Sequence, residues 1–225
     1  MRSIRTEPAP QDSASSAPIP AAASPTRVRG AVVLSVISLV LMIAATLAGL
    51  LVDGLYRDSI STVSMLRAYD LVTLAVVAPG LAIGGVGARR GSTRATLLWL
   101  GMLAATVYTY AYYLFEAALS DAFLVHVAVF SSALFGLILG LSAVDVESFA
   151  ERFSPKTPRR WIAGFLAVLA VSLGGLWLSA AAQFALTDRV PAGSALVETD
   201  SLVKLGIALD LSLLVPGYAI AAVLL

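Results

Sequence analysis

The chain lacks cysteine altogether and contains a single histidine, His126. Without a thiol it can form no disulfide, no cysteine-ligated metal site and no thiolate nucleophile. One histidine cannot supply the histidine pair of a zinc peptidase, and one histidine with two aspartates makes a weak metal constellation. The glycine run at residues 84–87 lies in an apolar segment, where small residues allow close helix packing, so it does not indicate a phosphate-binding loop. The sequence therefore predicts no catalytic residue and no metal site, identifies no cofactor, and makes an enzyme the weaker interpretation.

Charged residues are also scarce, at 13% of the chain, whereas apolar residues make up 59% and the mean hydropathy is +0.89. A water-soluble domain has about a quarter charged residues and could not bury so much apolar surface. The net charge of +1 gives no reason to expect nucleic acid as a partner. The composition indicates an integral membrane protein whose main partner is the lipid bilayer.

Six apolar segments are each long enough to cross the roughly 30 Å hydrocarbon core as a helix. They lie at about residues 30–52, 65–88, 94–117, 122–144, 161–186 and 202–225. They are too long and too continuously apolar for barrel strands, and their short connections predict antiparallel neighbours. Pro79 and Pro216 fall inside spans, where we expect them to kink the helix rather than end it. The predicted fold class is all-α: a polytopic transmembrane helix bundle of six spans over residues 29–225.

Residues 1–28 form a segment rich in Pro, Ala and Ser that we expect to be a disordered cytoplasmic tail. Orientation follows from Lys and Arg, which favour cytoplasmic loops. With the tail inside, eleven basic residues lie on the cytoplasmic side and four on the other. We therefore predict a multi-pass protein of the cell (plasma) membrane with a cytoplasmic amino terminus.

A short sequence motif occurs in both the second and the sixth span. Pro-Gly-Leu-Ala-Ile at residues 79–83 recurs as Pro-Gly-Tyr-Ala-Ile at residues 216–220, and each follows an Asp-Leu pair. The spacing from Asp to Pro differs by three residues, so coincidence is the alternative. If the motif marks a true internal repeat, the repeating unit comprises four helices. Since the last span also ends without a polar flank, we expect a fragment of an eight-helix protein.

Three stretches carry a resemblance to a known family. They are residues 69–73 (Tyr-Asp-Leu-Val-Thr) with Pro79, the tyrosine-rich residues 108–115, and residues 209–211 (Leu-Asp-Leu) with Pro216. The chain resembles an uncharacterised family of multi-pass bacterial membrane proteins of actinobacterial type over most of residues 30–225. That family has no assigned activity, so the resemblance implies the topology and the importance of these stretches but no catalytic residue.

Five polar side chains from four spans fall one to two helical turns from the outer surface, and they form the candidate buried polar site: Asp70, Tyr108, Tyr112, His126 and Asp210. An ionisable group inside a span costs at least ~2.5 kcal/mol, so it is expected to face the bundle or a water-filled cavity. Tyr108 and Tyr112 share a helix face that leads to an outer acidic rim, to which we assign Glu116 and Asp121.

Each of these residues also has a structural explanation. The tyrosines can belong to the aromatic belt, and His126 can be a hydrogen-bonding residue between helices. Asp70 can pair with Arg67, one turn earlier on the same helix. Asp210 has no well-placed partner on its own helix, since Lys204 is six residues away.

Two functions from different classes remain open. In the first, a transporter or permease uses the polar layer to exchange protons or to bind a cation or another small solute. In the second, the protein is a non-transporting assembly, anchoring or sensing subunit, and the layer holds helices together. Water access to Asp70 and Asp210 favours the first function, whereas a dry, fully paired layer favours the second. The sequence gives no oligomeric partner.

Overall fold

The computed structural model describes residues 25–151, 154, 156–187 and 200–225. It confirms the all-α transmembrane bundle, because six of its helices are long and apolar enough to cross a membrane. These six candidate spans are Thr26–Leu51, Ile60–Arg89, Thr93–Phe115, Phe123–Ser142, Arg159–Thr187 and Leu205–Leu224. The protein is thus a multi-pass membrane protein of the kind that the hydropathy pattern predicts.

The helical elements follow one another along the chain in this order: α1 (Pro25–Leu51), α2 (Ile60–Val72), a π-helical turn η1 (Thr73–Val77), α3 (Ala78–Arg89), α4 (Thr93–Phe115), α5 (Phe123–Ser142), α6 (Val146–Glu151), α7 (Arg159–Thr187), α8 (Asp200–Leu209), a second π-helical turn η3 (Asp210–Leu214) and α9 (Val215–Leu224). Residues 1–24 of the predicted tail lie outside the described residues.

Two helices begin five residues earlier than the hydropathy pattern indicates, and each has a local reason. α1 begins at Pro25, because proline suits the first turn of a helix, where its missing N–H is not needed. Residues 25–28 are therefore helical, although we expected them in the tail. α2 begins at Ile60, because the Ser59 side chain accepts a hydrogen bond from the backbone N–H of Thr62 and caps the helix.

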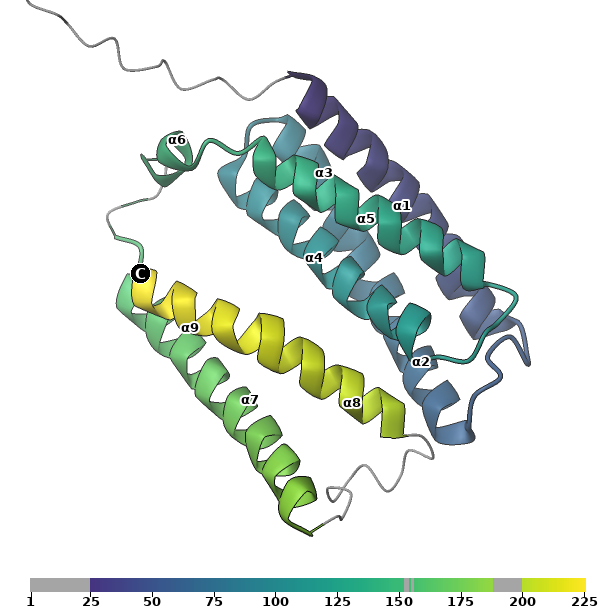
Figure 1. Cartoon of the computed structure of the whole chain (residues 1–225). Coiled ribbons are helices and arrows are strands. Elements are labelled where there is room, and N and C mark those ends of the chain that lie inside the picture. The colour runs from purple at the N-terminus through teal and green to yellow at the C-terminus, as the bar shows by residue number, and fades with distance from the viewer. Residues whose placement is uncertain (1–24, 152–153, 155, 188–199) are drawn as a thin grey trace, which may run out of the picture.

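The described spans form two packed groups, visible in Figure 1. In the first group, α1 packs along α5, while α4 packs against both α5 and α3. The second group holds α7 and the continuous helix formed by α8, η3 and α9. In it, α7 packs along α9 as an antiparallel pair (Figure 1). The main helix-to-helix contact between the groups is made by α4 and α8. We call the first group the four-span body and the second the α7–α9 pair.

Small residues allow the closest helix approach within the four-span body. A Cβ atom added to Gly84 of α3 would lie only 2.6 Å from the backbone nitrogen of Trp99 in α4. Gly87 faces Ala95 on the same two helices. The glycine run of residues 84–87 thus serves helix packing, as its place in an apolar segment predicts.

Both prolines lie just after a π-helical turn, and neither ends its span. The backbone N–H of Ala78 bonds the carbonyl of Thr73, and that of Val215 bonds the carbonyl of Asp210, each across five residues. Proline clashes with the carbonyl four residues before it in an ordinary helix, and the wider turn relieves this clash. The sequence motif shared by the second and sixth spans therefore coincides with a shared backbone feature, the π-helical turn just before each proline. Aligned on the prolines, Asp210 matches Thr73, and Asp70 lies about one turn earlier.

The two ends of the four-span body differ in charge. The arginine-rich end is formed by the start of α1, the end of α3 and the start of α4, and it holds Arg27, Arg29, Arg89, Arg90 and Arg94. At the opposite end, Arg57 pairs with Asp121 at 3.0 Å and Arg67 pairs with Asp53 at 3.3 Å. Both pairs are exposed, so each contributes little stability and mainly fixes the connecting loops.

Candidate functional site: two buried carboxylates

Asp70 of α2 lies inside the four-span body with 2% of its surface exposed. The Tyr56 hydroxyl donates to Asp70 Oδ2 at 2.7 Å, and the Tyr113 hydroxyl lies 2.9 Å from Asp70 Oδ1. Tyr56 comes from the loop after α1 and Tyr113 from the end of α4, so the carboxyl group joins three segments of the chain. Burial raises the pKa of the Tyr56 hydroxyl, which therefore remains a protonated donor.

Gly49 of α1 makes this approach possible. A Cβ atom at position 49 would overlap both Asp70 Oδ2 and the Tyr56 hydroxyl oxygen. Only a residue without a side chain lets α1 cover this hydrogen bond, so the packing of α1 and the position of the Asp70 carboxyl group depend on each other.

A proton on Asp70 would allow one more hydrogen bond in the cluster than the ionised form allows. Tyr113 has one hydroxyl proton but two acceptors within reach, Asp70 Oδ1 and the Leu66 carbonyl oxygen at 3.0 Å. If Asp70 Oδ1 carries a proton, it donates to the Tyr113 oxygen, and Tyr113 then donates to Leu66. Neither ion pair of the described residues includes Asp70. A neutral Asp70 satisfies every group and avoids an uncompensated charge inside the membrane.

His126 of α5 belongs to the same cluster through ring packing. Its ring lies 4.7 Å from that of Tyr113 and 5.7 Å from that of Tyr110, measured between centroids, and 2% of its surface is exposed. Asp70, Tyr113 and His126 are thus brought together on α2, α4 and α5.

Asp210 lies at the contact between the four-span body and the α7–α9 pair, with 6% of its surface exposed. Tyr108 of α4 donates its hydroxyl proton to Asp210 Oδ1 at 2.6 Å, and Trp177 of α7 donates its indole N–H to Asp210 Oδ2 at 2.6 Å. Asp210 is also the first residue of η3, so it sits where the helix widens. One carboxyl group therefore links both groups of helices.

The donors around Asp210 suit an ionised carboxylate. An indole N–H can only donate, and Tyr112 lies 3.1 Å from Tyr108, where it can donate to the Tyr108 oxygen. With Tyr112 donating to Tyr108 and Tyr108 to Asp210, every hydroxyl group points toward the carboxylate. Hydrogen bonds of this charge-assisted kind are short and roughly twice as strong as neutral ones. A proton on Oδ1 would turn Tyr108 into an acceptor and reverse the direction of the chain.

The five predicted site residues thus fall into two clusters instead of one shared centre. Tyr108, Tyr112 and Asp210 form one cluster, whereas Asp70 and His126 belong to the other. Tyr69 of α2 belongs to the Asp210 cluster, because its ring packs on that of Tyr112, with 5.6 Å between centroids. Successive residues on α2 and on α4, Tyr69 with Asp70 and Tyr112 with Tyr113, belong to different clusters because they point in different directions.

The predicted acidic rim lies at the end of the four-span body opposite the arginine-rich end. Asp121 pairs with Arg57, and Glu116 follows the last residue of α4. Arg67, which the sequence offered as an alternative partner for Asp70, pairs with Asp53 instead. Asp121 thus links the loops after α1 and α4 through Arg57.

Sequence reasoning missed Tyr56 and Trp177. Tyr56 lies in a loop that looks polar, and only the fold carries it inward. Trp177 did leave a signal: it stands well inside the fifth span, away from the boundaries where Trp usually gathers, and its N–H then needs an acceptor.

Within the described ranges, no group of three or more His, Cys, Asp or Glu side chains could hold a metal ion. The arrangement offers proton exchange and hydrogen bonding as its chemistry. No protein-family model, no curated protein and no solved structure matches this chain.

Proposed function

We propose that the protein is a transporter or permease of the bacterial plasma membrane, with its amino terminus in the cytoplasm and Asp210 as its working group. The observation that carries the proposal is the position of Asp210 between two groups of helices, bonded to Tyr108 on one side and to Trp177 on the other. Transporters bind substrate and coupling ions at such interfaces, near interrupted helices, and move one group against the other.

Charge on Asp210 would couple to this movement. As a carboxylate it accepts two charge-assisted hydrogen bonds, one from each group of helices. A proton or a small cation on Asp210 competes with these bonds and weakens the contact, so that the α7–α9 pair can move. Among the side chains that the structure describes, the titratable groups that face it are Tyr108 and Tyr112 of α4, with Tyr69 of α2 behind Tyr112.

Transport in proteoliposomes tests this function. Purified protein is reconstituted with a pH-sensitive dye inside, and a proton gradient is applied in the presence of individual cations and small solutes. We expect solute-dependent proton movement that Asp210→Asn abolishes and Asp70→Asn largely retains. Equal activity of the wild type and Asp210→Asn would contradict the assignment of Asp210.

A non-transporting assembly, anchoring or sensing subunit is the second candidate, and the Asp70 cluster favours it. Both Asp70 oxygens have partners, and the group is almost completely buried, as expected of a bond that only holds helices together. If Asp210 behaves in the same way, Asp210→Asn should cost only ~0.6 kcal/mol of stability and leave the function of the protein intact.

A further inference from the structure

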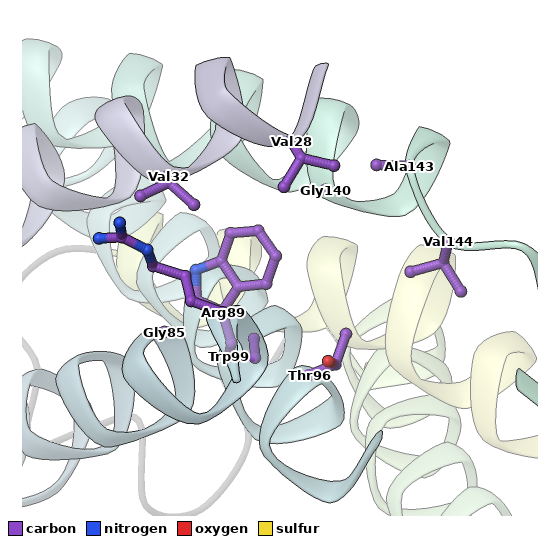
Figure 2. A pocket seen from close by; sticks show the side chains of 10 residues that line it. Val28, Val32, Gly85, Arg89, Thr96, Trp99, Gly140, Ala143 and Val144 are labelled. Carbon is purple, nitrogen blue, oxygen red and sulfur yellow. The ribbon is translucent and has the colours of Figure 1, made fainter. Parts of the chain in front are cut away.

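The arginine-rich end carries a groove that neither carboxylate cluster uses. Two adjoining hollows of about 180 Å³ and 160 Å³ lie beside α1 and α3, and they share Val32, Gly85, Arg89 and Trp99. Figure 2 shows the side chains of Arg89 and Trp99 next to each other, below Val32 of α1.

The walls of this groove are mainly hydrocarbon. The second hollow continues between α1 and α3 along Val36, Leu39, Leu81 and Val86. The one polar atom of the Trp99 indole is already used, since Nε1–H donates to Ser35 Oγ at 2.9 Å. Val36 and Val86 are 54% and 51% exposed, so the groove is open toward the membrane. It suits a flexible apolar chain that lies along the helices.

A positive charge lies at the polar end of the groove. Arg89 lines both hollows, and neither ion pair of the described residues includes it. Four further arginines of the arginine-rich end are exposed nearby on α1, on α4 and in the turn after α3, namely Arg27, Arg29, Arg90 and Arg94. Basic pockets between membrane helices bind anionic lipid head groups.

We propose that this groove binds one anionic phospholipid, with its phosphate on Arg89 and one acyl chain along α1 and α3. The charge of Arg89 selects a negative head group, while the apolar walls require an acyl chain, so a soluble phosphate lacks half of the contacts. The site is independent of transport at Asp210.

Native mass spectrometry of the purified chain, titrated with phosphatidylglycerol or with phosphatidylcholine of the same acyl chains, tests the proposal. We expect a one-to-one complex with phosphatidylglycerol and little binding of phosphatidylcholine or of soluble glycerol phosphate. Arg89→Gln should weaken phosphatidylglycerol binding about five-fold, the effect of one basic side chain near the membrane surface. Arg90→Gln, its neighbour outside the groove lining, is the matched control and should bind as the wild type does.

A second pair of variants tests the acyl chain. Val36→Phe narrows the groove and should weaken binding, whereas Val33→Phe, on the same helix but outside the groove lining, should not. Thermal melting of each variant confirms folding, and Ala82→Leu offers a second way to fill the groove. Equal losses for Arg89→Gln and Arg90→Gln would overturn the proposal in favour of diffuse attraction. Unchanged binding in both groove-filling variants, or glycerol phosphate binding as tightly as the lipid, would overturn it as well.

Discussion

Gly49 of α1 faces the carboxyl group of Asp70 so closely that a methyl group at position 49 would overlap Asp70 Oδ2. The absence of a side chain in one helix thus positions an ionisable group in another. Gly49→Ala should therefore destabilise the protein by about 1–3 kcal/mol, the usual cost of overpacking. Thermal unfolding in detergent measures this loss.

Gly101→Ala is the control for that experiment. Nothing lies within 4 Å of a Cβ atom at this helical position in α4. Replacing an exposed helical glycine by alanine should leave stability unchanged or raise it by about 0.5–1 kcal/mol. Equal melting temperatures for the two variants would argue against the packing described at Asp70.

Asp70→Asn should be tolerated, because the amide reproduces the neutral carboxyl group. Its NH₂ can donate to the Tyr113 oxygen and its oxygen can accept from Tyr56. The expected loss is about 0.6 kcal/mol, whereas Asp70→Leu leaves both hydroxyl groups without their partner and should cost more. Chemical denaturation compares the two variants; a loss as large for Asn as for Leu would contradict the claim that the amide replaces a neutral Asp70.

Trp177→Phe should loosen the α7–α9 pair from the four-span body while the body stays folded. The variant removes the N–H that bonds Asp210 Oδ2, and polar contacts inside membranes are worth at most about 1.7 kcal/mol. Hydrogen exchange should rise in α7 and α9 but not in α1 or α5. Trp161→Phe, at a side chain that is 84% exposed, should have no such effect. A rise across all helices would instead indicate global destabilisation.

The predicted orientation can be tested with reporter fusions in the two short connections that flank α2 and α3. A fusion after Asp58 should report the outside and one after Gly91 the inside, because arginines gather near Gly91. The reverse result would place the buried carboxylates in the other leaflet.

The sequence was sufficient for the six spans, because length and hydropathy alone decide which helices can cross a membrane. It also indicated that Asp70, His126 and Asp210 face the interior, and all three are buried. It could not indicate that Tyr112 and Tyr113 belong to different clusters, because that depends on how α4 is rotated against α2 and α8. Nor could it place Tyr56, since a loop residue enters the core only after α1 and α2 have packed. The short helix α6 was missed because it is too short to leave a clear periodicity.

The distance between the four-span body and the α7–α9 pair reports directly on the role assigned to Asp210. Because the chain has no cysteine, spin labels can be attached at single introduced cysteines, such as Leu124→Cys in α5 and Leu186→Cys in α7, which are 76% and 84% exposed. A control pair, Leu124→Cys with Val52→Cys, stays within the body. Pulsed electron paramagnetic resonance should give a narrow distance distribution in the wild type and a broad one in Asp210→Asn, whereas the control pair should stay narrow in both proteins. An identical narrow distribution in the wild type and in Asp210→Asn would contradict a contact that depends on the Asp210 carboxylate.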